Sequence, residues 1–223
     1  MDAGLLPVKR FSRAKRRLGA ELEPAERLLV ARALWEDALE LCERADFLTW
    51  WVVSDDPELN AEASNRGFGA IPDGDGLNAA LRRGIETVDA AGAASITVVP
   101  CDVPLARPGD LRDLLDTGAT SDVVVVPSGR DGGTNGLHLS PPDIIAPQFG
   151  PGSLQAHLTL ARDRGCRCSV LPLSRLALDI DTPADIRALL AYPPAQDGRT
   201  AGILRAMRPW AGADPPPGDR ATR

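Results

Sequence analysis

The sequence of 223 residues has few aromatic side chains, histidines and cysteines, and each scarcity excludes something. Aromatic residues make up 4% of the chain, so the core must consist mainly of Leu, Val, Ile and Ala. None of the four cysteines forms a Cys-x-x-Cys pair and only two histidines occur, which argues against a zinc site. Neither a signal-peptide pattern nor a long uncharged apolar run is present. We therefore expect a cytoplasmic protein with reduced thiols that does not interact with membranes.

A surplus of basic residues is also missing, because the formal net charge is -6 and the sequence pI is about 5.0. This balance argues against nucleic acid as a partner, since phosphate backbones select basic surfaces. A local group of cations can still bind a small anion. Such a group follows the first apolar run and consists of Lys9, Arg10, Arg13, Lys15, Arg16 and Arg17. It suits a triphosphate cradle, and the alternative is a solvated basic face.

Short apolar runs alternate with amphipathic runs along the chain, a pattern typical of a three-layer α/β sandwich with a mainly parallel, Rossmann-like sheet. Strands are expected at 5–8, 47–53, 95–100, 122–126, 136–139 and 169–173. Helices are expected at 24–44, 57–65, 76–91, 108–116, 152–164 and from 183 onward. We expect one domain over residues 1–192. The Pro-, Gly- and Arg-rich residues 193–223 would form a mostly flexible tail with one short helix near 203–207.

Acidic residues stand where such a fold binds ligands, beyond the carboxyl ends of its strands. Asp102 directly follows the buried run 95–100, and a carboxylate there suits Mg²⁺, although an aspartate in a plain turn is the alternative. Asp179 and Asp181 would lie on one side of an extended segment, where they repel unless a cation lies between them or they face water. Asp185 is better explained as part of a helix cap, and Asp181 could also cap that helix.

Glycine-rich stretches provide a second kind of candidate site, because backbone amides without a Cβ nearby can approach an anion closely. In 130–137 the hydroxyl of Thr134 adds a donor. The segment from Phe149 to Ser153 precedes a helix, whose N-terminus favours a phosphate. Capping by Ser153 is the alternative, and it is compatible with anion binding. Asn78 in the first turn of another helix could read a base or ribose, or could be a surface residue.

Together these motifs resemble one family closely. The motifs are Pro7-Val8-Lys9, Ala14-Lys15, Arg17-Leu18, Gly76-Leu77-Asn78, Cys101-Asp102-Val103-Pro104, Gly132-Gly133-Thr134-Asn135, Phe149-Gly150-Pro151-Gly152-Ser153 and Leu178-Asp179-Ile180-Asp181-Thr182-Pro183-Ala184-Asp185. Over about residues 5–190 the chain is similar to the 2-phospho-L-lactate/phosphoenolpyruvate guanylyltransferases of coenzyme F-420 biosynthesis. That resemblance implies the nucleotidyltransferase fold of the molybdenum-cofactor guanylyltransferases, which is nucleotide-diphospho-sugar transferase-like.

The resemblance also implies roles for single residues. It places Lys9, Lys15 and Arg17 at the phosphates of GTP, with Lys9, Lys15 and Asp102 catalytic, and Asn78 near the guanosine. It assigns Mg²⁺ to Asp102 and Asp179, with Asp181 in support. The phosphorylated acid would bind at Thr134, Gly150 and Ser153. The implied reaction joins GMP to the acceptor phosphate and releases pyrophosphate.

The acceptor stays open, because phosphoenolpyruvate, 2-phospho-L-lactate and 3-phosphoglycerate differ by few atoms, and phosphoenolpyruvate is the first choice. Two rival functions also remain. One is a related nucleotidyltransferase that uses molybdopterin, or CTP with a sugar or polyol phosphate. The other is a catalytically silent nucleotide-binding protein. A homodimer is equally open, because Trp35, Trp50 and Trp51 could all be core or could in part form a subunit contact.

Overall fold

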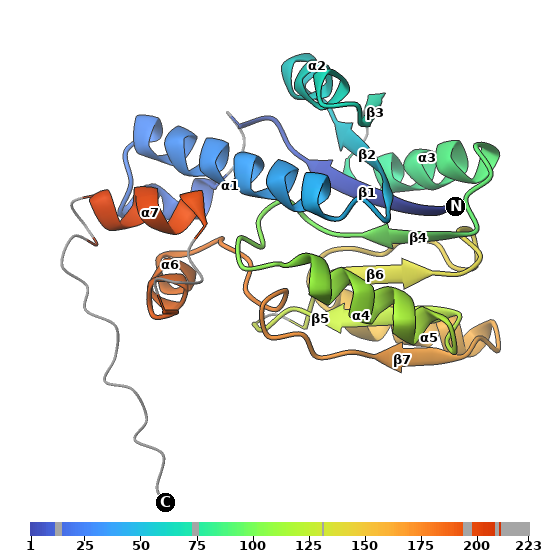
Figure 1. Ribbon diagram of the computed structural model, residues 1–223. Coiled ribbons are helices and arrows are strands. Elements are labelled where there is room, and N and C mark those ends of the chain that lie inside the picture. Colours follow the sequence, from blue (N-terminus) through green and yellow to red (C-terminus); the bar gives the residue numbers. More distant parts are fainter. Residues whose placement is uncertain (12–14, 73–75, 131, 194–197, 208–209, 211–223) are drawn as a thin grey trace, which may run out of the picture.

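The computed structural model describes residues 1–11, 15–72, 76–130, 132–193, 198–207 and 210. Seven strands form one sheet in the order β3-β2-β1-β4-β6-β5-β7. They are β1 (Asp2–Val8), β2 (Thr49–Ser54), β3 (Gly69–Pro72), β4 (Ser95–Val98), β5 (Val123–Pro127), β6 (Thr134–Leu139) and β7 (Cys168–Val170). All neighbouring pairs are parallel except the two that involve β6, which runs antiparallel to both β4 and β5. In Figure 1 the arrow of β6 accordingly points opposite to those of β1, β4 and β7.

Alternating side chains of the strands feed two separate cores, one on each face of the sheet. In β1, Leu6 and Val8 join the cluster on one face, whereas Ala3 and Leu5 join the cluster on the other. Helices α1 (Pro24–Arg44), α2 (Pro57–Asn65) and α4 (Pro108–Gly118) cover the first face. Helices α3 (Leu77–Ala90) and α5 (Ser153–Asp163) cover the second. The predicted three-layer α/β sandwich is therefore confirmed.

The helices begin where their sequence signals predict. A proline occupies the first turn of α1, α2 and α4, where a missing N–H costs nothing. In α1, the side chain of Glu26 in addition accepts the backbone N–H of Glu23, as in a capping box. The bounds predicted for α1 and α2 are confirmed, and those predicted for α3, α4 and α5 agree to within two residues.

The strand predictions were wrong in several places. Those at 47–53, 95–100 and 169–173 extend beyond the observed β2, β4 and β7 by two or three residues, and three further differences concern β1, β3 and β6. The first strand, predicted at 5–8, begins at Asp2, because residues 2–4 pair with β4 and, from Ala3 on, with β2. Gly4 leaves room there for the indole of Trp50. The short edge strand β3 was missed: its four residues pair only with β2 and are too few for a clear pattern. The strand expected at 136–139 begins earlier, at Thr134, so the glycine-rich loop ends directly in β6.

A third apolar cluster lies at the end of the sheet where the parallel strands terminate. It joins α1 and the short helix η2 (Arg16–Ala20) to α6 (Pro183–Leu190) and α7 (Arg199–Ala206). From α7 and beyond, Ala201, Leu204, Met207 and Trp210 are buried in it. The short helix predicted near 203–207 thus exists and begins earlier. The domain boundary at 192 stays a prediction, and most of the tail (194–197, 208–209 and 211–223) lies outside the described residues.

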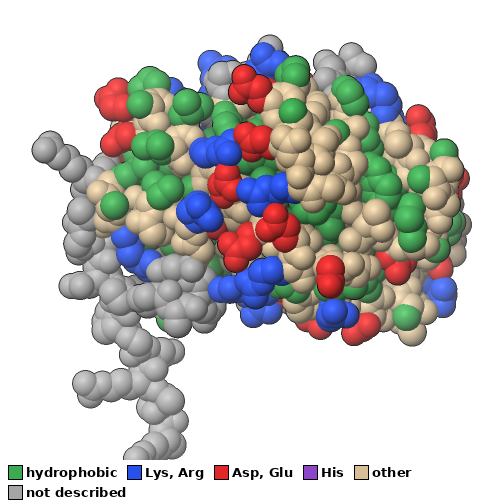
Figure 2. Space-filling view, turned by 45° about the horizontal axis from the view of Figure 1, so that its top comes forward, with side chains coloured by type: hydrophobic (Ala, Val, Ile, Leu, Met, Phe, Trp, Pro, Cys, Tyr) green, Lys and Arg blue, Asp and Glu red, His purple; other side chains and the backbone are tan. Residues whose placement is uncertain are grey.

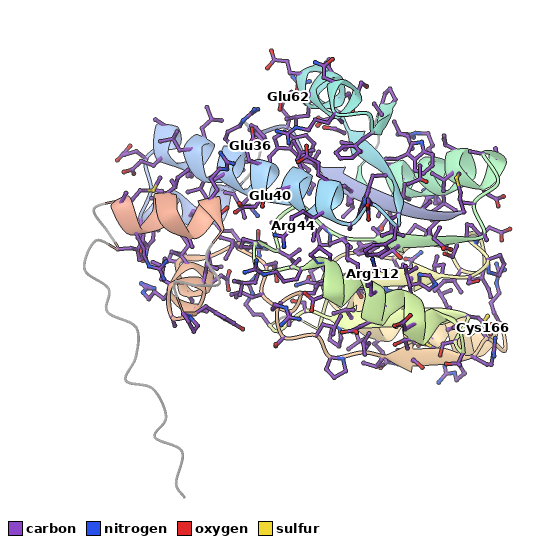
Figure 3. The ribbon with its side chains drawn as sticks, in the orientation of Figure 1. Glu36, Glu40, Arg44, Glu62, Arg112 and Cys166 are labelled. Carbon is purple, nitrogen blue, oxygen red and sulfur yellow. The ribbon has the colours of Figure 1, made fainter. Side chains whose placement is uncertain are left out.

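Ion pairs join the surfaces of α1 and α2. Figure 2 shows acidic and basic side chains interleaved on one face of the molecule. The Arg32 guanidinium contacts Glu62 at 2.6 Å and Glu36 at 2.7 Å, and Figure 3 shows the helices from which these two glutamates come. Trp35, which is fully buried, donates its indole N–H to Glu62.

No helix among the described residues is long and apolar enough to span a membrane.

Candidate active site

Residues from three distant segments meet at the carboxyl ends of β1 and β4. Asp102 follows β4 by four residues, and its carboxylate accepts a hydrogen bond from the Lys15 ammonium at 2.7 Å. The same ammonium lies 3.3 Å from Asp181. The backbone N–H of Ile180 donates to the carbonyl oxygen of Asp102 at 3.0 Å and so fixes the two acidic segments together. Two carboxylates as close in sequence as Asp179 and Asp181 are expected to need a cation nearby. At Asp181, this cation is the ammonium of Lys15.

A cavity of about 360 Å³ opens over this cluster. Its charged lining consists of Lys9, Lys15, Arg16, Arg17, Asp102 and Asp181. Its apolar lining includes Phe11 from the loop after β1, Leu34 from α1 and Leu77 from α3. The site therefore offers several cations and two carboxylates beside apolar walls, and its size suits a small organic ligand.

Lys15 reaches this place through an unusual backbone conformation. Its φ of 53° lies in the left-handed region, and it is the one non-glycine residue with positive φ among those that the structure describes. Such a conformation is costly for a long side chain and is typical of functional sites. Burial disfavours the charged ammonium, since only 8% of the Lys15 side chain is exposed, but the carboxylates of Asp102 and Asp181 outweigh this effect and raise the pKa of Lys15. Lys15 is consequently a permanent cation.

Cys101 borders the same cavity but does not serve as a nucleophile at neutral pH. Burial, with the Asp102 carboxylate adding to it, raises the pKa of the Cys101 thiol to about 12. Since only a thiolate attacks efficiently, the neutral Cys101 thiol contributes only contact surface to the cavity lining.

Asp179 lies beside the first cluster and is held by the glycine-rich loop. Its carboxylate accepts hydrogen bonds from Asn135 at 3.0 Å and from Ser128 at 3.3 Å, and the Arg130 guanidinium contacts it at 3.3 Å. Burial raises the pKa of Asp179, and the nearby Asp102 and Asp181 carboxylates add to the rise, while Asn135 and Arg130 oppose it.

Arg130 connects this loop to the start of α6. Besides Asp179, it contacts Asp185 at 2.5 Å and Asp181 at 3.9 Å. Asp185 accepts the backbone N–H groups of Asp181 and Thr182, so its predicted role in the helix cap is confirmed. These hydrogen bonds and Arg130 all engage Oδ2 of Asp185, and Asp185 is not among the residues that line the cavity.

Thr134 and Ser153 meet at a separate point, between β6 and α5. Ser153 donates its hydroxyl to the Thr134 hydroxyl oxygen at 3.1 Å, and the Thr134 oxygen lies 3.1 Å from Nδ1 of His157. Nε2 of His157 accepts the backbone N–H of Gln148 at 2.9 Å. The three side chains are nearly enclosed, with 6%, 2% and 0% of Thr134, Ser153 and His157 exposed. Burial lowers the pKa of His157 to about 4, so the ring is neutral at physiological pH.

The exposed glycines Gly150 and Gly152 lie on the loop that leads into α5. Their φ angles of 138° and 71° are readily adopted only by glycine. The backbone amides of Ser153 and Leu154 are already used, by the carbonyl oxygens of Gly150 and Gly132. An anion at this loop would therefore meet side-chain hydroxyls and the remaining amides.

Asn78 holds the same loop from α3. Its amide nitrogen donates to the carbonyl oxygen of Phe149 at 2.9 Å, and its amide oxygen accepts the Phe149 N–H at 2.7 Å. The Phe149 ring packs edge-on against His157, with 5.4 Å between centroids. Asn78 thus contacts the loop next to the predicted acceptor residues, and its predicted proximity to guanosine stays a prediction.

The structure groups the predicted residues into two neighbouring sets. Lys9, Lys15, Arg17, Asp102 and Asp181 surround the cavity, and Thr134, Gly150 and Ser153 lie along β6 and the entry to α5. Asp179 connects the sets through Asn135, the neighbour of Thr134 on β6.

Sequence reasoning missed three residues of this arrangement. Arg130 and Asn135 stand inside the glycine-rich segment 130–137, in which only the glycines and Thr134 predict a function from sequence. His157 follows Ser153 by four residues, a spacing that places both on one face of a helix and could have revealed it.

A solved structure defines the fold, and a family match defines the class. The fold matches that of a protein from Desulfovibrio desulfuricans G20 assigned as a nucleotide-diphospho-sugar transferase, with a TM-score of 0.76 and 18% identity over 92% of this chain and 94% of that one. The fold is thus of the nucleotide-diphospho-sugar transferase type. Residues 3–208 match the family described as guanylyl transferase CofC like, and the chain belongs to this family. It is accordingly an enzyme of the nucleotidyltransferase class.

Relatives carry names that differ in the acceptor. A phosphoenolpyruvate guanylyltransferase of Conexibacter woesei is 37% identical, with 91% of this chain and 95% of the relative covered. A 3-phospho-D-glycerate guanylyltransferase of Phenylobacterium zucineum is 33% identical, with coverages of 93% and 97%. A 2-phospho-L-lactate guanylyltransferase of Methanothermobacter thermautotrophicus is 31% identical, with coverages of 92% and 90%.

Proposed function

We propose that this enzyme joins GMP from GTP to the phosphate of a small phosphorylated carboxylic acid, with release of pyrophosphate, in coenzyme F-420 biosynthesis. The observation that carries the proposal is the cavity in which Lys15 bridges Asp102 and Asp181 beside Lys9, Arg16 and Arg17. Phosphoenolpyruvate is the proposed acceptor, in keeping with the names of several relatives.

The charge arrangement suits the difficulty of this reaction. Both reactants are phosphorylated anions, so their approach is opposed by repulsion that fixed cations can offset. The Lys15 ammonium stays charged at every working pH, and Lys9 and Arg17 line the same cavity. The apolar walls at Phe11, Leu34 and Leu77 would take the nucleoside.

The chemistry requires no strong general base. The acceptor phosphate is already an anion, and an oxygen of it attacks the α-phosphorus of GTP while the bond to pyrophosphate breaks. The chain's contribution is then alignment of the two groups and stabilisation of the charge that builds on the leaving pyrophosphate. This agrees with the neutral His157 and the protonated Cys101.

Asp102 and Asp179, supported by Asp181, are the proposed ligands of Mg²⁺. Asp102 and Asp181 line the cavity, and Asp179 lies beside them. No group of three or more His, Cys, Asp or Glu side chains placed to hold a metal ion occurs in the described part of the chain. Mg²⁺ characteristically takes one or two carboxylates together with substrate phosphates, so two hard oxygen donors beside a phosphate cavity fit this ion. When bound, it would polarise the α-phosphate of GTP.

Pyrophosphate release tests the nucleotide half of the proposal. The purified enzyme would receive GTP, CTP or ATP with Mg²⁺ and phosphoenolpyruvate, and pyrophosphate would be measured. We expect release with GTP only. Release with CTP would favour a sugar- or polyol-phosphate enzyme, and tight GTP binding without release on any acceptor would favour a silent binding protein.

A further inference from the structure

Two buried hydroxyls and a histidine form a hydrogen-bonded chain with a fixed direction between β6 and α5. Nε2 of His157 accepts the backbone N–H of Gln148, so the ring proton resides on Nδ1. Nδ1–H therefore donates to Thr134, and the oxygen of Thr134 is an acceptor in this contact. The ring is fixed further by the Phe149 side chain, which packs against it.

Counting protons in this chain leaves one hydroxyl donor available. Thr134 and Ser153 have one hydroxyl proton each, and Ser153 uses its proton in the hydrogen bond to the Thr134 oxygen. Because His157 also donates to Thr134, it cannot accept the other proton. That proton must therefore point to a group outside the His157–Thr134–Ser153 set. A hydroxyl donor beside the exposed Gly150 and Gly152 and the N-terminus of α5 suits a phosphate or carboxylate oxygen.

We propose that His157 is a positioning residue for the acceptor: its Nδ1–H turns the Thr134–Ser153 hydroxyl pair so that one hydroxyl donates to the phosphorylated acid. This rests on the proposed function, because it takes that acid as the ligand of Thr134 and Ser153. His157 does not touch the acid and transfers no proton. Its effect is confined to acid affinity.

The position of the His157–Thr134–Ser153 set explains why a change in it would affect binding of the acceptor rather than binding of GTP. Successive residues of β6 point to opposite faces of the sheet, so Thr134 faces His157 on α5 while Asn135 reaches Asp179. The cavity that contains Lys15 lies on the side of Asp102 and Asp181, and its lining includes neither Thr134 nor Ser153.

Two substitutions separate the donor at Nδ1 from the acceptor at Nε2. His157→Asn keeps an N–H near the position of Nδ1, whereas His157→Gln keeps an oxygen near Nε2 for Gln148 but loses the directed donor to Thr134. The matched control is His138→Gln at the other histidine of the chain, which is also buried and also hydrogen-bonded to a threonine, Thr97.

The experiment measures phosphoenolpyruvate affinity by calorimetry, with turnover measured separately. We expect His157→Gln to weaken phosphoenolpyruvate binding about tenfold to a hundredfold, since a hydrogen bond to a charged group is lost. GTP affinity should stay within about twofold. His157→Asn should restore phosphoenolpyruvate affinity to within about threefold of wild type, and His138→Gln should leave it unchanged even if the folded fraction falls.

Three outcomes overturn the inference: equal phosphoenolpyruvate affinity in wild type and His157→Gln, equal losses of GTP and acid affinity, or no phosphoenolpyruvate binding by the wild type. A merely structural role would lower the active fraction, and hence kcat, at constant KM. Failure of the proposed function looks different. There phosphoenolpyruvate would bind with the expected dependence on His157, but no GMP would be transferred to it.

Discussion

At the scale of single residues, the ion pair between Lys15 and Asp102 is the contact on which the proposed chemistry of the site depends most. The ammonium is nearly enclosed and bridges two carboxylates that come from distant parts of the chain. The Asp102 carboxylate is placed to bind cations, whether these are Lys15, Mg²⁺ or both. Its charge, rather than its shape, should therefore matter for catalysis.

Asp102→Asn tests that charge with little change in shape. We expect the rate of guanylyl transfer to fall about 10²–10³-fold, the usual cost of losing one electrostatic contact to a transition state. The far-ultraviolet circular dichroism spectrum should not change. Asp89→Asn, at an exposed position near the end of α3, is the control that should retain full activity. Near-normal turnover of Asp102→Asn with GTP and Mg²⁺ would eliminate the proposed metal role.

His157 makes a second prediction at this scale, on stability against pH. In the folded protein burial lowers its pKa to about 4 from an ordinary 6.5. Between these values the unfolded chain binds a proton that the folded chain excludes, so the free energy of unfolding falls as pH falls. The contribution of His157 is complete above pH 6.5 and drops by up to about 3 kcal/mol as pH approaches 4.

Urea unfolding of wild type and His157→Asn at a series of pH values isolates this contribution from that of the carboxyl groups. The difference in unfolding free energy between the two proteins should shrink from pH 7 to pH 4. A difference that stays constant over that range would show that the buried histidine titrates as it does in the unfolded chain.

At the scale of elements, α7 ties the residues after 198 to the core. Its Leu204 is fully buried in the cluster shared with α1 and α6. Leu204→Ala should lower the free energy of unfolding by about 2–5 kcal/mol, the range for a buried leucine. Leu29→Ala makes the same deletion at a residue of α1 that is 54% exposed and should cost far less. Equal effects in urea unfolding would mean that α7 packs weakly in solution.

The elements also show what the sequence can and cannot predict. The bounds of α1 and α2 could be predicted because their signals are local: a proline in the first turn and apolar residues at helical spacing. The start of β1 could not, because its first residues pair with strands far along the chain: Gly4 lies opposite Trp50, 46 positions away, and Asp2 opposite Ser95. Asp102 and Asp179 could be chosen from local signals, namely a place after a strand or in an acidic pair. Arg130 meets Asp179 and His157 meets Thr134 only in the folded chain, and the spacing of His157 from Ser153 was its one local signal.

At the scale of the whole molecule, the site lies where the two halves of the sheet meet. β1 and β4 place Lys9, Lys15 and Asp102 at the carboxyl edge, and the antiparallel β6 begins at that same edge with Thr134 and Asn135. One strand reversal therefore brings the proposed acceptor residues next to the proposed nucleotide cavity. Because the protein as a whole carries a net charge of -6, only local groups of cations would attract the two anionic substrates, and such a group lines the cavity.

The central claim is that this enzyme joins GMP to a small phosphorylated acid. It is tested most directly by identifying the product that wild type forms from GTP, Mg²⁺ and an equal mixture of phosphoenolpyruvate, 2-phospho-L-lactate and 3-phosphoglycerate. Mass spectrometry should find a diphosphate that links guanosine to one of the acids, predominantly phosphoenolpyruvate, together with released pyrophosphate. GTP consumption without any guanylylated acid, or no reaction with any of the three, would contradict the account.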